Sequence, residues 1–105
     1  MQNSKQNGCF FIQNRNLEWG LYVYDGKTQA LSGKEFQVME MLMQNRGVIV
    51  TAEQLITHIW GWNTDVDTSV VYVHVSNIRK KLDALSAPVA IKFVRNAGYI
   101  LEATV

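Results

Sequence analysis

The sequence predicts an α+β domain in which a short antiparallel sheet is followed by three helices and then by a β-hairpin. Segments rich in aromatic and branched residues come first, and polar turns separate them, as is typical of short strands. Two Ser/Thr-x-x-Glu/Gln boxes then each precede an apolar pattern of helical period, which indicates two helix starts. A third amphipathic segment predicts another helix, and two apolar runs around an Asn- and Gly-containing turn predict the hairpin.

Length and composition fit one globular domain. The chain has 105 residues, of which 48% are hydrophobic and 18% charged, enough for a single core but not for two. Cys9 is the only cysteine, so no internal disulfide can form, and metal-ligand spacings are absent. We therefore expect no metal and no cofactor. No apolar run reaches membrane-spanning length and no signal peptide is visible, which favours a cytoplasmic protein.

The first third of the chain divides into a polar tail and a set of strands. Residues 1–8 are predicted to be disordered, and residues 9–105 form the predicted folded domain. Polar residues 14–16 and the tight-turn dipeptide Asp25-Gly26 are expected to break the strands. Three or four strands are expected, over Phe10–Ile12, Leu17–Leu21, Tyr22–Tyr24 and Lys27–Leu31.

A capping box marks the start of the first helix. Ser32 and Glu35 have the Ser-x-x-Glu spacing in which each side chain bonds the other residue's backbone N–H. Gly47 is the expected C-terminal stop. The apolar residues at helical spacing are more typical of core packing than of a cofactor site, and they are Phe36, Met39, Leu42 and Met43.

The second helix is expected after the short apolar connector Val48–Val50. Thr51 and Gln54 repeat the capping-box spacing, and Gly61 is the expected stop. His58 has no Cys, His or carboxylate partner at ligand spacing, so we expect an ordinary helix residue. The apolar face comprises Leu55, Ile56, Ile59 and Trp60.

The third helix is predicted over Ser69–Leu82, with Thr68 or Ser69 as its N-cap. Its buried stripe repeats at i, i+4, i+7 and i+11 and comprises Val71, Val75, Ile78 and Leu82. The opposite face comprises Ser69, Val73, Ser76, Asn77 and Lys80, with Tyr72 and Arg79 on one flank and Val70, His74 and Lys81 on the other. Two interpretations of this face are open on the segment alone. It is either a solvated surface with a basic C-terminus, or a surface that enters a DNA major groove and contacts base edges and phosphates.

The segment that follows favours the second interpretation. Ile91–Val94 and Tyr99–Leu101 are predicted strands joined by Arg95–Gly98, and an Arg at a hairpin tip is suited to a minor groove or a phosphate. Three helices followed by a hairpin form a winged helix-turn-helix layout. Residues 69–105 carry five Lys/Arg and two Asp/Glu, against five and seven in residues 1–68, so positive charge is concentrated in this part.

The sequence also resembles a known family, the DNA-binding effector domains of OmpR/PhoB-type bacterial response regulators. Four motifs between about Leu31 and Leu101 carry the resemblance, namely LSGKEFQVMEML, GVIVTAEQLITHIWG, VDTSVVYVHVSNIRKKL and IKFVRNAGYIL. They are similar, in order and spacing, to the family's first helix, second helix, recognition helix and wing. Each motif alone is weakly specific, whereas the four in order are highly specific.

The resemblance implies that the third helix enters the major groove and that the hairpin wing lies on the minor groove or the backbone. It implies double-stranded promoter DNA as the partner, with RNA polymerase and a homodimer on DNA as further partners. The predicted DNA-binding residues are Trp60, Ser69, Val70, Tyr72, Val73, Ser76, Asn77, Arg79, Lys80, Lys81 and Arg95. The implied polymerase contact lies in the loop Gly61–Asp67, at Trp62, Asn63, Thr64 and Asp65.

Several positions depart from the family's usual residues. Arg, Thr, Asp and Arg are frequent where this chain has Ser69, Val70, Tyr72 and Asn77, and the wing has Phe93 for a usual Thr and Asn96 for a usual Gly. The base-reading residues have therefore changed while the supporting helices have not, so the operator sequence does not carry over. Val70 and Val73 are suited to thymine methyl groups, and Asn77 is suited to adenine.

Two functions are compatible with the sequence. The first is a sequence-specific DNA-binding transcriptional regulator, and the alternative is a winged-helix protein-interaction module with weak or non-specific DNA binding, which the low net charge of +1 favours. An enzyme and a small-molecule substrate are not expected, because paired carboxylates, a Gly-rich phosphate loop and a metal cluster are absent from the sequence. The chain is compatible with an excised effector domain, a short regulator, or the cytoplasmic head of a membrane-anchored regulator.

Overall fold

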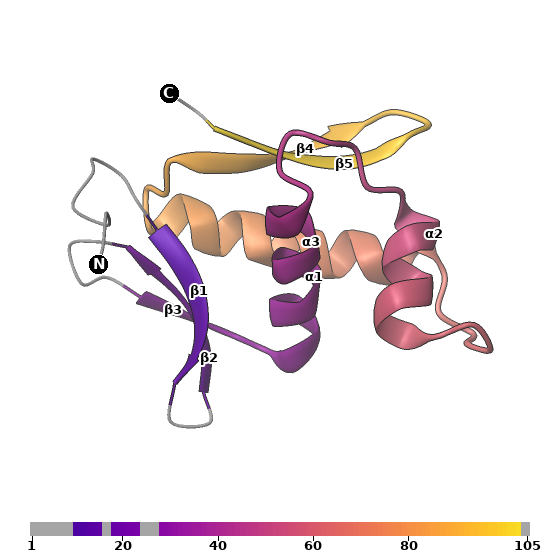
Figure 1. Cartoon of the computed structure of the whole chain (residues 1–105), viewed down its shortest axis with the longest axis horizontal. Helices are drawn as coiled ribbons and strands as arrows, with labels where there is room; N and C mark the ends of the chain where they lie inside the picture. The colour runs from indigo at the N-terminus through magenta and orange to yellow at the C-terminus, as the bar shows by residue number, and fades with distance from the viewer. Residues whose placement is uncertain (1–9, 16–17, 24–27, 104–105) are drawn as a thin grey trace.

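The computed structural model of the chain describes residues 10–15, 18–23 and 28–103. Its elements follow the predicted order, with a three-stranded sheet, then the helices, then a two-stranded hairpin (Figure 1). They are β1 (Phe10–Arg15), β2 (Glu18–Val23), β3 (Thr28–Leu31), α1 (Gly33–Gln44), α2 (Ala52–Leu55), η2 (Ile56–Trp60), α3 (Thr68–Ala84), β4 (Val89–Val94) and β5 (Gly98–Ala103). The segment predicted to be disordered, 1–8, lies outside the described residues, so the domain boundary at residue 9 stays a prediction.

The N-terminal sheet is antiparallel, with the strand order β1-β2-β3. The predicted break at residues 14–16 begins later than expected, because β1 continues through Arg15, which pairs with Glu18 of β2. The segments predicted over Leu17–Leu21 and Tyr22–Tyr24 contribute to a single strand, β2. Its pairing with β1 and with β3 continues without a break from Leu21 to Tyr22, where the sequence predicts that two strands meet.

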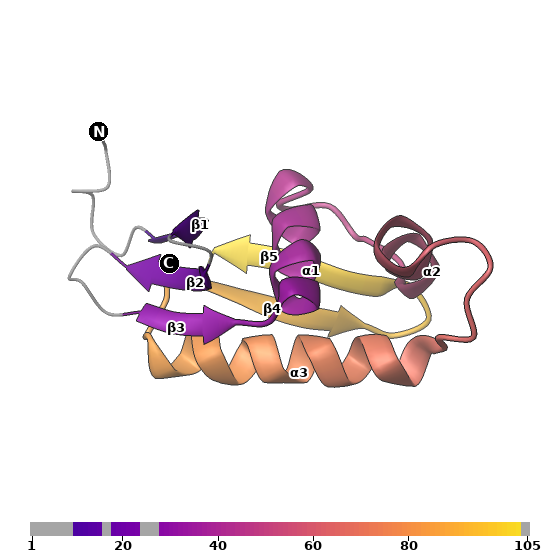
Figure 2. The same cartoon turned by 90° about the horizontal axis from the view of Figure 1, so that it is seen from below.

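The core lies where α1 crosses α3 and where the hairpin β4–β5 runs along α3 (Figures 1 and 2). The predicted stripe of α3 is confirmed, since all four residues are buried, namely Val71, Val75, Ile78 and Leu82. The helix α1 contributes Phe36, Val38, Met39 and Leu42, and the hairpin contributes Val89, Ile91, Tyr99 and Leu101. Each buried side chain of this size stabilises the fold by roughly 1.5–3 kcal/mol relative to an exposed one.

Both predicted capping boxes are formed. The Glu35 N–H donates to Ser32 Oγ at 3.1 Å, and the Ser32 N–H donates to Glu35 Oε1 at 3.0 Å. The Gln54 N–H donates to Thr51 Oγ1 at 3.0 Å, and the Thr51 N–H donates to Gln54 Oε1 at 2.8 Å. These bonds satisfy backbone donors that a helix start leaves without partners, so the two helices begin where the sequence predicts.

The second helix differs from the expectation in its last turn. After one α-helical turn, η2 is a π-helix in which the Gly61 N–H donates to the Ile56 carbonyl at 3.0 Å. In the same turn the Ile59 carbonyl accepts a hydrogen bond from Lys34 Nζ at 3.1 Å, which ties this helix to α1. Gly61 ends the helix as predicted, with a φ of +100° that favours glycine.

The helix α3 is slightly longer than predicted at both ends. Its N-cap is Asp67 and not Thr68 or Ser69, because the Asp67 carboxylate accepts hydrogen bonds from the hydroxyl and the N–H of Ser69. These bonds lower the pKa of Asp67. At the other end α3 continues past Leu82 to Ala84, and the chain then turns.

The wing hairpin is attached to the connector between α1 and α2. Val50 and Tyr99 exchange two backbone hydrogen bonds of 2.8 Å each, so the connector forms a short bridge to β5. At the tip, Asn96 adopts a φ of +63°, as the predicted turn requires. Gly98 lies so close to the connector that a Cβ there would be 2.2 Å from the Val50 carbonyl oxygen.

We expect Gly98→Ala to lower the free energy of unfolding by about 1–3 kcal/mol, because the methyl group forces the wing away from the connector. Thermal unfolding followed by circular dichroism measures the change. Gly33→Ala is the control, since a Cβ on Gly33 meets no atom within 4 Å. If Gly98→Ala melts at the same temperature as the parent protein, the close contact between wing and connector is not part of the fold.

Candidate nucleic-acid interface

The two flanks of α3, on either side of its buried stripe, differ in character. On one flank, His74 and Lys81 are partly buried and contact the second helix and α1. On the other flank, Tyr72 and Arg79 are exposed and lie near Tyr99 of the hairpin. We call the first the closed flank and the second the open flank. Of the outward residues between them, Ser69, Val73 and Lys80 are exposed, whereas Ser76 and Asn77 are partly buried. Val70, on the closed flank, is also partly buried.

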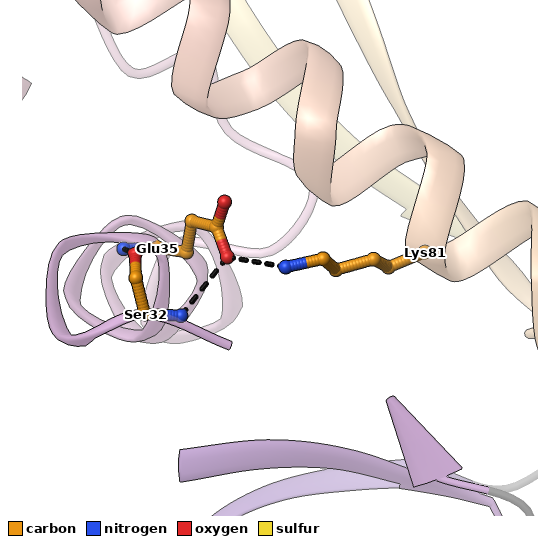
Figure 3. A network of polar contacts seen from close by, with 3 residues as sticks. All are labelled: Ser32, Glu35 and Lys81. Atoms are coloured by element: carbon orange, nitrogen blue, oxygen red, sulfur yellow. Dashed lines mark hydrogen bonds and ion pairs between the residues drawn. The ribbon is translucent and has the colours of Figure 1, made fainter. Parts of the chain in front are cut away.

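An ion pair holds the closed flank. Lys81 Nζ lies 2.6 Å from Glu35 Oε1, and the same oxygen accepts the Ser32 N–H (Figure 3). Only 8% of the Glu35 side chain is exposed. Burial acts to raise the pKa of Glu35, but the hydrogen bonds from Lys81 and Ser32 and the nearby Lys81 charge outweigh it, so the pKa is lowered. Lys81 thus neutralises a carboxylate of the domain itself. In this respect it differs from the exposed residues of the predicted DNA-binding site.

Trp60 is packed between α1 and α3. Its ring meets that of His74 edge-on, with the ring centroids 5.2 Å apart, and the Lys34 ammonium lies 5.6 Å from the Trp60 ring centroid. The imidazole of His74 is held by its own helix, since Nδ1 lies 2.9 Å from the Val70 carbonyl oxygen. Trp60 is partly buried in this position and borders the closed flank.

Aromatic rings lie at the junction between the open flank and the hairpin. The ring centroids of Phe93 and Tyr99 are 5.6 Å apart on neighbouring strands. Burial raises the pKa of Tyr99, and the nearby Tyr72 adds to this rise while Arg79 opposes it. Tyr99 is buried, whereas 53% of Tyr72 and 56% of Phe93 are exposed. Apolar surface therefore extends from the open flank of α3 onto the wing.

Phe93 is the residue of this surface that the sequence-based prediction missed. Side chains alternate between the two faces of a strand, so Phe93 lies on the same face as the buried Ile91 and would be expected to be buried too. Burial stops after Ile91, however, because the hairpin leaves the core there. The one sequence signal was the replacement of the family's usual Thr by an aromatic residue at this position.

A groove separates the second half of α3 from the base of the hairpin. It has a volume of about 460 Å³. Its helix side is formed by Ser76, Arg79, Lys80, Leu82 and Asp83, and its hairpin side by Val89, Ala90 and Ile91. Arg79 and Lys80 therefore lie at the rim of a concave surface as well as on or beside the outward face of α3.

The free positive charge of this region is more limited than its composition suggests. Lys81 pairs with Glu35, and Lys92 pairs with Glu102 across the hairpin at 3.0 Å. Among the described residues, the remaining cations of α3 and the wing form no ion pair, namely Arg79, Lys80 and Arg95. The first two lie in the second half of α3. Arg95 is at the wing tip, which lies toward the N-terminal end of α3 in both views (Figures 1 and 2).

The loop that the resemblance links to RNA polymerase joins η2 to α3. Trp62 is 86% exposed, and Asn63 and Asp65 are also exposed. Thr64 is partly buried, and its hydroxyl accepts the Val66 N–H at 3.2 Å. The loop therefore presents a large apolar ring next to polar groups.

Sequence comparison identifies the family. A family profile described as "Transcriptional regulatory protein, C terminal" matches residues 26–101. The chain belongs to this family. The predicted OmpR/PhoB-type resemblance is thereby confirmed, and the relatives are transcriptional regulators and not enzymes.

Individual relatives agree with this assignment. The regulatory protein VanRB of Enterococcus faecalis is 40% identical over 78 residues, which cover 74% of this chain and 34% of VanRB. The heme response regulator HssR of Staphylococcus aureus is 41% identical over 76 residues, which cover 72% of this chain and 34% of HssR. The chain thus spans about one third of the length of the curated relatives it matches.

A solved structure confirms the winged helix-turn-helix fold. The DNA-binding domain of Klebsiella pneumoniae RstA, solved in complex with the RstA box, is similar with a TM-score of 0.67 and 30% identity. The similarity covers 87% of this chain and 90% of that domain. In the described residues of the present chain, no helix has the length and apolar character needed to cross a membrane. The same residues contain no cluster of three His, Cys, Asp or Glu side chains that could hold a metal.

We expect Lys81→Met to lower the free energy of unfolding by about 1–3 kcal/mol, because the buried Glu35 carboxylate loses its cation. Chemical denaturation measures the change. Lys80→Met is the matched control, since Lys80 is exposed, and it should change stability by less than about 0.5 kcal/mol. Equal stabilities of the two variants would contradict the structural role of Lys81.

The lowered pKa of Glu35 predicts a pH dependence of stability. A carboxyl with a lower pKa in the folded state stabilises the fold above its unfolded pKa, about 4.3, and this stabilisation is lost as the pH falls through the folded pKa. Glu35→Gln removes the charge but keeps a side chain that can close a capping box, as Gln54 does at Thr51. We expect the free energy of unfolding to fall less steeply below about pH 4.3 in the variant than in the parent protein. Parallel pH curves would contradict this.

Proposed function

We propose that this chain is a sequence-specific DNA-binding transcriptional regulator. The observation that carries the proposal is the exposed face of α3, which combines small and apolar groups with Arg79 and Lys80 and lies beside a wing tipped by Arg95. A helix of this kind fits the major groove, where small side chains approach base edges and cations contact phosphates. The similarity to the RstA domain, which was solved with its DNA box, supports this proposal.

The proposed arrangement places α3 in the major groove and the wing on the minor groove or the backbone. Arg95 at the wing tip and Arg79 and Lys80 on α3 are the proposed phosphate or minor-groove contacts. The outward residues Ser69 and Val73 face the base edges. Trp60 and Lys81 lie on the closed flank. They contribute to DNA binding indirectly, because the packing of Trp60 on His74 and the ion pair of Lys81 with Glu35 position α3.

The family resemblance implies further partners, which we also propose. The exposed Trp62 and its polar neighbours in the loop Trp62–Asp65 are the proposed contact with RNA polymerase. We also propose that the chain acts as the effector part of a cytoplasmic two-component response regulator and that two copies bind adjacent DNA half-sites. The names of its relatives, such as the heme response regulator HssR, support the regulator assignment.

A second candidate function is a protein-interaction module with weak or non-specific DNA binding. The exposed apolar side chains of Tyr72, Val73 and Phe93 favour it, because large exposed apolar groups are common at protein interfaces. The two functions differ in whether binding depends on DNA sequence. A regulator enriches particular sequences from a random duplex library, whereas an interaction module does not. Any DNA binding that the module retains is non-specific and also weakens as salt rises, so sequence enrichment is the deciding measurement.

We expect Lys80→Ala and Arg95→Ala each to weaken binding to a random-sequence duplex and to reduce the slope of log K against log salt by about 1. The physical reason is that each cation releases condensed counterions when it contacts a phosphate. Titrations at several salt concentrations measure the slope. Arg46→Ala is the control, because Arg46 is an exposed cation in the turn after α1, at the end of that helix away from α3 (Figure 2). Slopes equal to that of the parent protein would remove these cations from the interface.

A further inference from the structure

We propose that α3 reads A·T base pairs, mainly through contacts of Val73 and Tyr72 with thymine C5-methyl groups. The inference rests on the proposed DNA-binding function and specifies which base pairs the helix recognises. It starts from the chemical groups that the outward face presents, and from where the cations lie relative to them.

The first half of the outward face has no charged group that could reach into the groove. Ser69 donates its hydroxyl to Asp67 in the N-cap, so this hydroxyl is already engaged. Tyr72 and Val73 are more than half exposed. Ser76, one turn further on, carries only a hydroxyl and is partly buried. The groups available for base contacts in this part are therefore an isopropyl group and a phenol ring.

The unpaired cations of α3 and the wing lie outside this apolar part. Arg79 and Lys80 follow Val73 by six and seven residues, which is roughly 9–10 Å along a helix that rises 1.5 Å per residue. Arg95 lies on the wing. This distribution places positive charge on both sides of an apolar centre, as expected for a surface whose edges contact phosphates and whose centre contacts bases. The same charge pattern favours a polyanion over an apolar protein partner as the occupant.

The chemistry of the base edges then selects A·T pairs. Guanine is usually read by a bidentate Arg or Lys, which this part of the helix lacks, whereas thymine alone presents a methyl group in the major groove. Val73 placed against guanine or cytosine would leave their polar groups without partners, which is unfavourable. An A·T pair also presents polar groups, but its thymine methyl is an apolar group that Val73 can bury, which offsets this cost. Asn77, partly buried on the same helix, is suited to the paired adenine and would reinforce this preference.

Tyr72 extends this apolar contact toward the wing. It lies near Tyr99, which in turn contacts Phe93, and both Tyr72 and Phe93 are more than half exposed. This arrangement gives the helix a second apolar contact one residue from Val73, on its open flank. Thymines at neighbouring positions of the site are therefore expected.

The experiment begins with selection of preferred duplexes from a random library at fixed salt. We expect a consensus rich in A·T pairs at the centre of each half-site. Each thymine of the selected duplex is then replaced singly by deoxyuridine, which keeps every hydrogen-bonding group and removes only the C5-methyl. Because one buried methyl contributes about 0.8 kcal/mol, the affinity should fall about four-fold at each contacted thymine and remain unchanged elsewhere.

A double-mutant cycle assigns the contact to Val73. We expect Val73→Ala to weaken binding to the thymine duplex and to abolish the effect of deoxyuridine at one position. Tyr72→Ala should do the same at a neighbouring position. Val48→Ala is the matched control, because Val48 is exposed to a similar extent, 58% against 55% for Val73, but lies in the connector between α1 and α2. Circular dichroism verifies that the variants remain folded.

The outcomes separate this inference from the proposed function. Enrichment of G·C-rich sites, or unchanged affinity at every deoxyuridine position, would overturn methyl recognition while leaving sequence-specific binding intact. Equal losses for Val73→Ala on thymine and deoxyuridine duplexes would also overturn it. If the library yields no enriched sequence at all, the proposed function fails, and the inference fails with it.

Discussion

The burial of one edge of α3 sets the orientation on which the whole proposed interface depends. Val71, Val75, Ile78 and Leu82 lie in one core with α1 and the hairpin. Because each residue of a helix is rotated by about 100° from the last, holding this edge in the core also determines which side chains face outward. Turning α3 to present other residues would expose part of the stripe, at a cost of roughly 1.5–3 kcal/mol for each large side chain. The outward face is therefore a consequence of core packing.

The Glu35–Lys81 ion pair acts on this orientation from the closed flank. Glu35 closes the capping box of α1 and accepts the ammonium of Lys81, so one carboxylate joins the start of α1 to the second half of α3. A carboxylate that is only 8% exposed requires such partners, since removal of one member leaves a buried charge. The pairing also explains why the net charge of the whole chain is a poor guide to how much positive charge is free to contact a partner. Cations that appear equivalent in sequence, such as Lys80 and Lys81, differ in whether their charge is available to a partner.

The wing is positioned by contacts far from its tip. Its strand β5 pairs with the connector through Val50 and Tyr99, and Gly98 allows the two backbones to approach closely. The separation between wing and α3 is thus tied to the same connector that leads into the second helix. In the proposed complex, in which α3 and the wing contact adjacent grooves of DNA, this separation is as important as the chemistry of either element. This attachment also places Tyr99, and Phe93 in contact with it, beside the open flank.

Sequence by itself determined the features of this protein whose causes are local. The two capping boxes each span four residues, the stripe of α3 follows from helical period, and the turn at Asn96 follows from its tolerance of positive φ. Tertiary structure alone decided the character of the two flanks of α3. The partners Glu35 and Lys81 are 46 positions apart, and neither spacing nor motif indicates their contact. The exposure of Phe93 likewise depends on where the hairpin leaves the core. These properties arise only when α1 packs against one side of α3 and the hairpin against the other, because long-range packing brings together groups that no local pattern connects.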